Sequence, residues 1–383
     1  MDFELSEENR LWQETIRDFA AKELRPISAE FDRQAEFPAA AFKKMASLGL
    51  LGLNVPEEYG GAGVDAVGAA VAIEAVGWAD GGIGLSTAAH NGLGCAPIAL
   101  FGTGEQRARW LPSLSTGARG LAALALTEPA GGSDLAGSVQ TRAQRSGDSW
   151  VIDGTKAWIT NASVAEVIVT LARTDPDAGK HGFSLIIVPA DAPGLTVHPP
   201  EHKMGVRSSP THALSYEGVR VPLDHLLGQP GEGLRQSFEV LDGGRVSVGA
   251  LSVGLARAAF GEAVRYARER PAFGLPLAQH QAIQFMLADA HTEIEAARLL
   301  VYRAAGLKAN GAPFTREAAQ CKLFASEVAE RVCRNAIQVL GSYGYSLEYP
   351  VERMYRDARL MTIGEGTSEI LRMVIARRIP EMP

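Results

Sequence analysis

The sequence is short of cysteine and of long apolar runs, and each shortage excludes a class of protein. Its 383 residues include three cysteines, Cys95, Cys321 and Cys333, which lie far apart and outside any CxxC spacing. This usage indicates reduced thiols in a reducing compartment rather than a disulfide framework. No uncharged apolar run approaches the roughly 18 residues of a membrane-spanning helix. We therefore expect no membrane span.

A surplus of positive charge is also missing. The chain has 37 Lys and Arg against 44 Asp and Glu, a formal net charge of −7, whereas a general nucleic-acid binder carries a basic excess. The amino-terminal residues are acidic and show neither a signal-peptide core nor an Arg- and Ser-rich transit pattern. These features predict a soluble cytoplasmic protein with no nucleic-acid partner.

Several common catalytic motifs are absent as well. There is no GxxxxGK[ST] phosphate loop, no GxGxxG after a strand, and no HExxH or Cys/His ligand spacing. Ser133 stands in GGSD, which is not a GxSxG nucleophile elbow. We expect no Rossmann cofactor site and no bound metal.

Hydrophobic periodicity divides the chain into three parts of an α+β protein. Residues 1–120 are predicted to form a helical domain, with helices over 7–23, 38–51 and 64–77. Residues 121–227 carry short β-branched runs separated by turns, which predicts a mostly antiparallel β-sandwich or barrel without crossover helices. Residues 228–383 return to a 3.6-residue period in four long segments, which predicts a C-terminal four-helix bundle. The last of the four follows Thr367 and Ser368, two candidate helix caps.

Two segments of the middle part stand out. Residues 124–134 (LALTEPAGGSD) combine a strand with a glycine-rich turn, where small residues let backbone N–H groups approach a ligand. Residues 158–161 (WITN) place a tryptophan and a threonine two apart, on one face of a strand. Taken singly, the first segment is equally consistent with an ordinary tight turn, and the second is more simply a half-buried aromatic.

Together these segments resemble the acyl-CoA dehydrogenase family, closest to its short- and medium-chain members, over essentially the whole chain. Five further matches follow in the family's order: 270–274 (RPAFG), 280–285 (HQAIQF), 338–341 (QVLG), 355–358 (YRDA) and 365–370 (EGTSEI). The resemblance implies the family's fold: an N-terminal helical domain, a middle antiparallel β-domain and a C-terminal four-helix bundle.

The resemblance also implies a bound FAD and names the residues that would hold it. It places Trp158 against the flavin ring and Thr160 near flavin N5, and it assigns Arg270 to the FAD of a neighbouring subunit. A site shared between subunits implies an oligomer, typically a homotetramer built as a dimer of dimers. The complete cofactor set is Leu126, Thr127, Gly132, Ser133, Trp158, Ile159, Thr160, Arg270, Phe273, Gln281, Gln338, Gly341, Thr367 and Glu369.

The same resemblance makes Glu365 the catalytic base. α,β-Dehydrogenation of a thioester needs a base for the α-proton and a hydride acceptor at the β-carbon, and a desolvated carboxylate has a pKa suited to the first task. An alternative reading is an acid at a helix N-terminus, which suits Glu369 better. Some family members carry the base on the long helix instead, at the position of Gly244, which has no carboxylate here.

The substrate side is implied by fewer residues. Ser133, Asp242, Arg245 and Gly366 match positions near the acyl-CoA and the base loop, although Asp242 and Arg245 could equally form an internal ion pair. Gly84 stands where glutaryl-type members carry an arginine, which disfavours a dicarboxylic substrate. Gly364 replaces a tyrosine frequent in short- and medium-chain members, so chain length stays open.

The leading hypothesis is therefore an acyl-CoA dehydrogenase that passes electrons to an electron-transfer flavoprotein. One alternative is an acyl-CoA oxidase or a flavin monooxygenase relative on the same fold, since oxygen reactivity depends on pocket access. Another is a flavin-free helical scaffold, against which the intact motifs argue.

Overall fold

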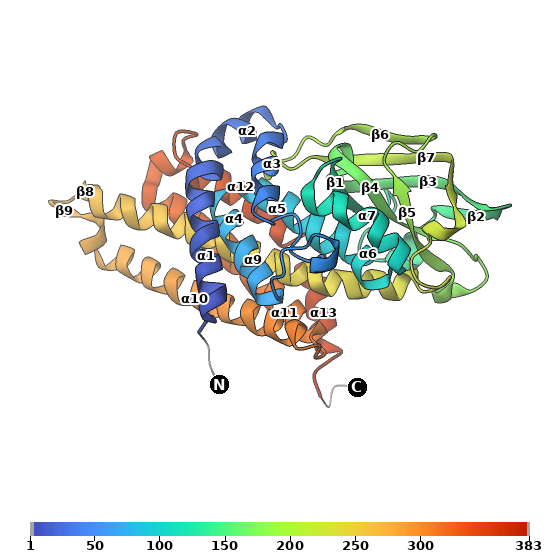
Figure 1. The fold of residues 1–383 in the computed structure, drawn as a ribbon. Coiled ribbons are helices and arrows are strands. Elements are labelled where there is room, and N and C mark those ends of the chain that lie inside the picture. Colours follow the sequence, from blue (N-terminus) through green and yellow to red (C-terminus); the bar gives the residue numbers. More distant parts are fainter. Residues whose placement is uncertain (1–3, 381–383) are drawn as a thin grey trace.

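Helices fill the amino-terminal region of the computed structural model, which describes residues 4–380 (Figure 1). The helices predicted over 7–23, 38–51 and 64–77 are found. Side-chain oxygens of Ser6, Asp65 and Asp80 cap the first turns of α1, α4 and α5. The bounds are α1 Glu7–Phe19, α2 Ser28–Gln34, α3 Ala39–Ser47, α4 Ala66–Ala79, α5 Gly81–Ala89, α6 Ala96–Phe101 and α7 Gly104–Thr116.

The middle region is a sheet, which Figure 1 shows to one side of the helices. In the described chain it has seven strands in the order β1-β4-β2-β3-β7-β6, with β5 paired to β4. The pairs β2–β3, β3–β7, β4–β5 and β6–β7 are antiparallel, as predicted. The bounds are β1 Leu121–Ala125, β2 Arg142–Ser146, β3 Ser149–Thr160, β4 Ala165–Arg173, β5 Phe183–Pro189, β6 Leu195–Pro200 and β7 Thr211–Pro222.

Two pairs in this sheet, β1–β4 and β2–β4, are parallel and depart from the prediction. Strands β1 and β4 run parallel, with Ala122 opposite Val167 and Ala125 opposite Thr170. A parallel pair needs a long connection, and we had excluded one because no crossover helix fits. Here the β2–β3 hairpin supplies that connection, together with the four-residue helix α8, Leu135–Ser138.

The carboxyl-terminal region is helical, but its helices differ from the prediction. In the described part of the chain three of them are long: α9 Gly233–Glu269, α10 Gln281–Ala309 and α11 Thr315–Leu340. A short hairpin of β8 Pro271–Ala272 and β9 Leu275–Pro276 joins α9 to α10. Two short helices follow, α12 Val351–Met361 and α13 Ser368–Ala376. The caps at Thr367 and Ser368 predict α13, whereas no sequence pattern indicated α12.

Most of the two helical regions share one hydrophobic core, whereas α6 and α7 pack with β4 and β5 of the sheet in a second. Ile73 and Val76 of α4 belong to the same buried cluster as Leu251 of α9 and Val328 of α11. Since both regions bury apolar surface against each other, neither completes its core alone.

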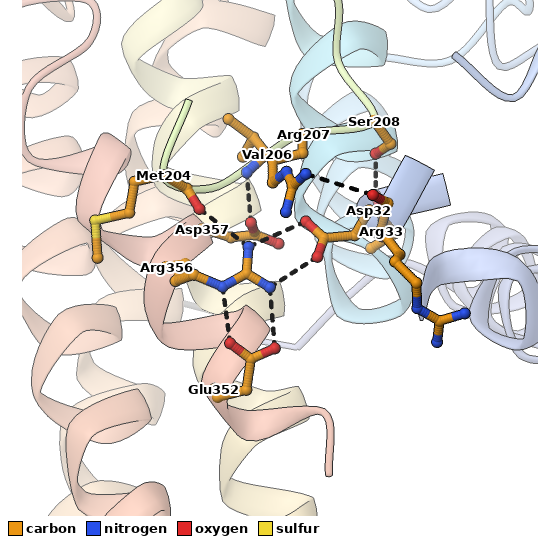
Figure 2. A network of polar contacts seen from close by, with 10 residues as sticks. Asp32, Arg33, Met204, Val206, Arg207, Ser208, Glu352, Arg356 and Asp357 are labelled. Carbon is orange, nitrogen blue, oxygen red and sulfur yellow. Dashed lines mark hydrogen bonds and ion pairs between the residues drawn. The ribbon is translucent and has the colours of Figure 1, made fainter. Parts of the chain in front are cut away.

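A polar network fixes the sheet to both helical regions (Figure 2). Arg356 of α12 pairs with Asp32 of α2, at 2.7 Å, and with Glu352. It also donates to the carbonyl of Met204 in the loop before β7. The neighbouring Asp357 accepts the backbone N–H of Val206, at 2.5 Å. Arg356 and Asp357 of the YRDA segment therefore connect the carboxyl-terminal helices to α2 and to the loop before β7.

Candidate active site

Glu365 lies in the turn between α12 and α13, with a backbone φ of +54°. A non-glycine residue in this left-handed region is strained, and such strain is concentrated at functional sites. Thr367 ends the turn by accepting the N–H of Ile370, as the sequence predicted for a helix cap. The turn thus presents a carboxylate from a fixed backbone.

The Glu365 carboxylate is desolvated and incompletely bonded. Its Oε2 atom is inaccessible to water and has no hydrogen-bond partner among residues 4–380. Burial raises the pKa of Glu365 to about 7, although the positive charges of Lys322 and Arg245 act in the opposite direction. A carboxyl group with this pKa exchanges a proton readily near neutral pH.

Gly244 of α9 faces this carboxylate. A Cβ atom built at Gly244 would stand 2.1 Å from Glu365 Oε2 and 2.9 Å from Leu93 Cδ2. Leu93 belongs to the π-helical turn η4, His90–Cys95. The two positions that the resemblance offers for a base are therefore in contact, and the Glu365 carboxylate occupies the space that a side chain at position 244 would need.

Arg245 and Asp242 form the internal ion pair that the sequence left open. Arg245 Nη1 donates to Asp242 Oδ1 at 2.6 Å, and Thr315 of α11 donates to the other oxygen of Asp242. Arg245 Nε also reaches the backbone carbonyl of Glu365, at 3.5 Å. This pair is therefore both internal and in contact with the base turn.

Lys322 of α11 is a member of this site that sequence reasoning missed. Its side chain is fully buried, and its Nζ donates to the carbonyl of Gly366 at 2.7 Å. The available signal was its position: Lys322 follows Ala318 by four residues and precedes Ala325 by three, so it falls on the buried stripe of a predicted amphipathic helix.

The glycine-rich turn after β1 is braced by a second missed pair, Glu128 and Lys156. Lys156 Nζ donates to Glu128 Oε1 and to the carbonyl of Leu126, both at 3.0 Å. Glu128 also accepts the N–H groups of Gln140 and Thr141. The pKa of Glu128 is lowered because its ammonium partner and these donors outweigh burial. The N–H of Ala157 donates to Thr127, which ties β3 to the same turn.

A bulge in β3 turns Trp158 outward. The register with β7 shifts between Lys156 and Ile159, and Trp158 has a φ of +62°. Its indole is 59% exposed, whereas Ile159 is buried in the sheet core. The regular alternation assumed for this strand therefore breaks at Trp158, and only the backbone of Ile159 remains to contact a ligand.

These residues fit a flavin. An exposed aromatic face at Trp158 lies beside the partly exposed Thr160. In the turn, Gly132 and Ser133 are exposed, and a Cβ at Gly132 would meet only Thr127 Cγ2, at 3.6 Å, within the described structure. Open backbone, hydroxyl groups and a broad apolar ring are the groups that an isoalloxazine with its ribityl and phosphate groups requires.

The five residues expected to contact the FAD of a neighbouring subunit lie far from the Trp158 turn. Arg270, Phe273, Gln281, Gln338 and Gly341 are all exposed. They gather where α9 ends, α10 begins and α11 ends. Figure 1 shows the β8–β9 hairpin at the opposite end of the molecule from the sheet. One chain therefore does not bring Arg270 and Trp158 together.

Local packing explains the residues at two further positions, Glu369 and Gly84. Glu369 is exposed in the first turn of α13, where a carboxylate complements the helix dipole. Gly84 is buried in α5, and a Cβ there would stand 2.5 Å from Leu251 Cδ1. No side chain, an arginine included, fits at Gly84 without repacking.

Two kinds of feature, a metal-binding cluster and a membrane-spanning helix, are absent from the described residues. Residues 4–380 contain no group of three or more His, Cys, Asp or Glu side chains arranged to hold a metal ion. Within the same range, no helix combines the length and apolar character needed to cross a membrane.

The family models that match this chain, and a bacterial relative of it, belong to the acyl-CoA dehydrogenases. Three models match in succession: acyl-CoA dehydrogenase N-terminal domain over residues 6–118, middle domain over 123–219 and C-terminal domain over 231–379. A probable acyl-CoA dehydrogenase of Bacillus subtilis, YngJ, is 51% identical over 380 residues, which cover 99% of this chain and 100% of that protein.

Two solved structures are similar over nearly their whole lengths. Butyryl-CoA dehydrogenase from Megasphaera elsdenii is 40% identical with a TM-score of 0.95, and the match covers 98% of both chains. A chain in the structure reported as the electron transferring flavoprotein of Acidaminococcus fermentans is also 40% identical, with a TM-score of 0.97 and complete coverage of both chains.

Proposed function

Because this chain belongs to the acyl-CoA dehydrogenase family of oxidoreductases, we propose that it converts a saturated acyl-CoA into the trans-2-enoyl-CoA with Glu365 as the base. The observation that supports this most strongly is the Oε2 atom of Glu365, which is inaccessible to water and lacks a partner among the described residues, in a carboxyl group whose pKa burial raises to about 7. An ionised carboxylate in such a setting is a competent general base.

Different residues of the chain would serve as the base, stabilise the enolate and position the base turn. Glu365 removes the proton from the α-carbon and holds it on its carboxylate. The Glu365 turn also offers a backbone N–H that would donate to the thioester carbonyl and stabilise the developing enolate. Bound FAD would supply the hydride acceptor for the β-carbon. Arg245 and Lys322 hold the carbonyls of Glu365 and Gly366, which keeps the base turn in place.

We propose that FAD is held by residues of two chains. Leu126, Thr127, Gly132 and Ser133, together with Trp158, Ile159 and Thr160, would line it in one chain, and Thr367 and Glu369 would contribute from the start of α13. A neighbouring chain would supply Arg270, Phe273, Gln281, Gln338 and Gly341. The exposure of Arg270, and its position far from Trp158, support an oligomer, which we propose to be a homotetramer. The domain limits 1–120, 121–227 and 228–383 stay part of this proposal.

The substrate we propose is a monocarboxylic acyl-CoA of short to medium length. The filled space around Gly84 and the similarity to butyryl-CoA dehydrogenase support it. Ser133, Asp242, Arg245 and Gly366 would lie along the CoA and thioester. We propose an electron-transfer flavoprotein as the electron acceptor, which the second solved relative supports. The cytoplasmic location stays a prediction.

Anaerobic titration with a panel of acyl-CoAs, followed through the flavin absorbance, tests this function. Butyryl-, isovaleryl- or octanoyl-CoA should bleach the flavin faster than glutaryl-CoA does. Glu365→Gln should keep FAD and bind acyl-CoA, yet reduce its flavin about 10²- to 10⁴-fold more slowly, the usual contribution of a positioned base. The exposed acid Glu348 provides the matched control, and Glu348→Gln should behave as wild type. Near-normal reduction in Glu365→Gln would remove Glu365 from the mechanism, and rapid reoxidation in air would favour an oxidase.

A further inference from the structure

Lys322 is a buried cation without a carboxylate partner. Its side chain has no exposed surface, and the carbonyl of Gly366 is its one hydrogen-bond acceptor within the described residues. No carboxylate of residues 4–380 lies within 4.0 Å of its Nζ. A buried ammonium is costly unless other charges or dipoles compensate it.

Two other buried cations, Lys156 and Arg245, each have a carboxylate within hydrogen-bond distance, and Lys322 has none. Lys156 has Glu128 at 3.0 Å, and Arg245 has Asp242 at 2.6 Å. The electrostatic partner that acts most strongly on Lys322 is Glu365, which lacks a hydrogen bond on Oε2 in the described chain. Lys322 and the Glu365 carboxylate therefore interact through their charges without forming a direct ion pair, while Lys322 binds the neighbouring Gly366 carbonyl.

We propose that Lys322 is a positioning residue for the catalytic base: its ammonium anchors the turn through the Gly366 carbonyl, and its charge keeps the Glu365 carboxylate ionised. This inference rests on the proposed role of Glu365. It assigns Lys322 no contact with substrate or cofactor.

The anchoring part follows from the backbone of the turn. Glu365 has a φ of +54° and Gly366 a φ of +100°, so two successive residues leave the usual right-handed region. Such a turn persists only when its surroundings hold it. Here a cation from each flanking helix binds one of two successive carbonyls: Arg245 of α9 binds that of Glu365, and Lys322 of α11 binds that of Gly366.

The electrostatic part depends on every charge that faces the turn. Helix α9 contributes Arg245, whose charge Asp242 largely neutralises. Helix α11 contributes Lys322 and Glu327, and helix α13 contributes Glu369. The turn η4 contributes the apolar Leu93. Burial lowers the pKa of Lys322 to about 8, so it still carries its charge at neutral pH. Burial raises the pKa of Glu365, and Lys322 and Arg245 both lower it. Without Lys322, Arg245 alone would oppose the effect of burial.

The test is the pH dependence of flavin reduction by acyl-CoA, measured by stopped flow in Lys322→Met. Loss of a nearby opposite charge should move the acid limb of the profile upward by about one pH unit. Amide exchange, followed by mass spectrometry, should become faster across residues 362–368. Lys322→Arg should return the limb towards its wild-type position, because it restores the charge.

Lys308 of α10 is a matched control. It is also largely buried and has a lowered pKa, but burial is the cause and Glu365 makes no contribution. Lys308→Met should leave both the acid limb and the exchange of residues 362–368 unchanged. A purely structural role for Lys322 would lower rate and stability in Lys322→Met without moving the limb.

An unshifted acid limb in Lys322→Met therefore overturns the inference, whatever the rate. Should that variant not fold, Lys322→Gln, which keeps a polar group near the Gly366 carbonyl, is judged by the same shift. Failure of the proposed function is distinguishable, because Glu365→Gln would then reduce its flavin normally. A slow Glu365→Gln together with an unshifted Lys322→Met rejects the role of Lys322 alone.

Discussion

Moving the carboxylate from residue 365 to residue 244 is the most demanding test of the site's geometry. In wild type the Cβ of Gly244→Glu would stand 2.1 Å from Glu365 Oε2, so the new side chain and Glu365 compete for one space. Truncation in Glu365→Gly empties that space. Gly244→Glu alone should therefore lower the stability of the protein, and Glu365→Gly alone should lower its activity. The double variant should recover part of both.

The structure sets the scale of the single substitutions. Overpacking a buried site costs about 1–3 kcal/mol, and two carboxylates about 4 Å apart repel by up to about 4 kcal/mol at an effective dielectric constant near 20. Replacing a glycine inside α9 returns about 1 kcal/mol of helix propensity. Gly244→Glu should therefore lower the free energy of unfolding, by up to roughly 6 kcal/mol. Glu365→Gly, at a φ of +54°, should relieve backbone strain of about 1 kcal/mol.

The assays are urea unfolding and anaerobic flavin reduction on all four proteins of the cycle. The double variant should be more stable than Gly244→Glu by at least about 2 kcal/mol, a coupling expected of residues in contact. It should also reduce its flavin at least about tenfold faster than Glu365→Gly, since a positioned carboxylate contributes about 10²- to 10⁴-fold.

Gly243 provides the matched control for the relocation. It precedes Gly244 on α9, but a Cβ there would approach Lys308 Nζ, at 3.2 Å, rather than Glu365. Gly243→Glu combined with Glu365→Gly should recover no activity. Equal stability of Gly244→Glu and wild type, or no gain in the double variant, would refute the contact between positions 244 and 365.

Three further changes test other parts of the molecule. Lys156→Met should cost about 3–5 kcal/mol in urea unfolding, because it leaves the Glu128 carboxylate buried without its cation; a loss under 1 kcal/mol would contradict that reading. Arg270→Ala should lower the ratio of FAD to protein after gel filtration while leaving each chain folded, since Arg270 is exposed; full retention would make it an ordinary surface residue. Burial and the neighbouring Asp80 raise the pKa of Asp357 to about 7, so folding favours its protonated form and its contribution to stability falls as pH rises from the unfolded to the folded pKa. Relative to wild type, Asp357→Asn should therefore gain stability as the pH rises from about 4 to about 7, and a pH-independent difference in melting temperature would count against the shifted pKa.

The sequence predicted features that local pattern determines. Helical periodicity located α9, α10 and α11, and the hydroxyl of Thr367 marked the start of α13. Helix α12 escaped because its eleven residues are rich in charge and follow a stretch of glycine and tyrosine, where a short amphipathic pattern is difficult to separate from a loop.

The missed site residues depend on contacts distant in sequence. Lys322 meets Gly366 across 44 residues, and Lys156 meets Glu128 across 28. A lysine on an apolar stripe is visible in the sequence, but its partner is not. The outward turn of Trp158 was hidden too, because a bulge follows from how β3 pairs with β7.

Under the proposed sharing of FAD between chains, the distance between the Arg270 end and the Trp158 end of one chain makes catalytic competence a property of pairs of chains. Where each flavin needs both ends, an isolated chain is inactive, and dilution below the dissociation constant abolishes turnover without unfolding anything. Two inactive variants can also repair each other. When Arg270→Ala chains associate with Glu365→Gln chains, one site of each mixed pair receives both defects and the other receives none.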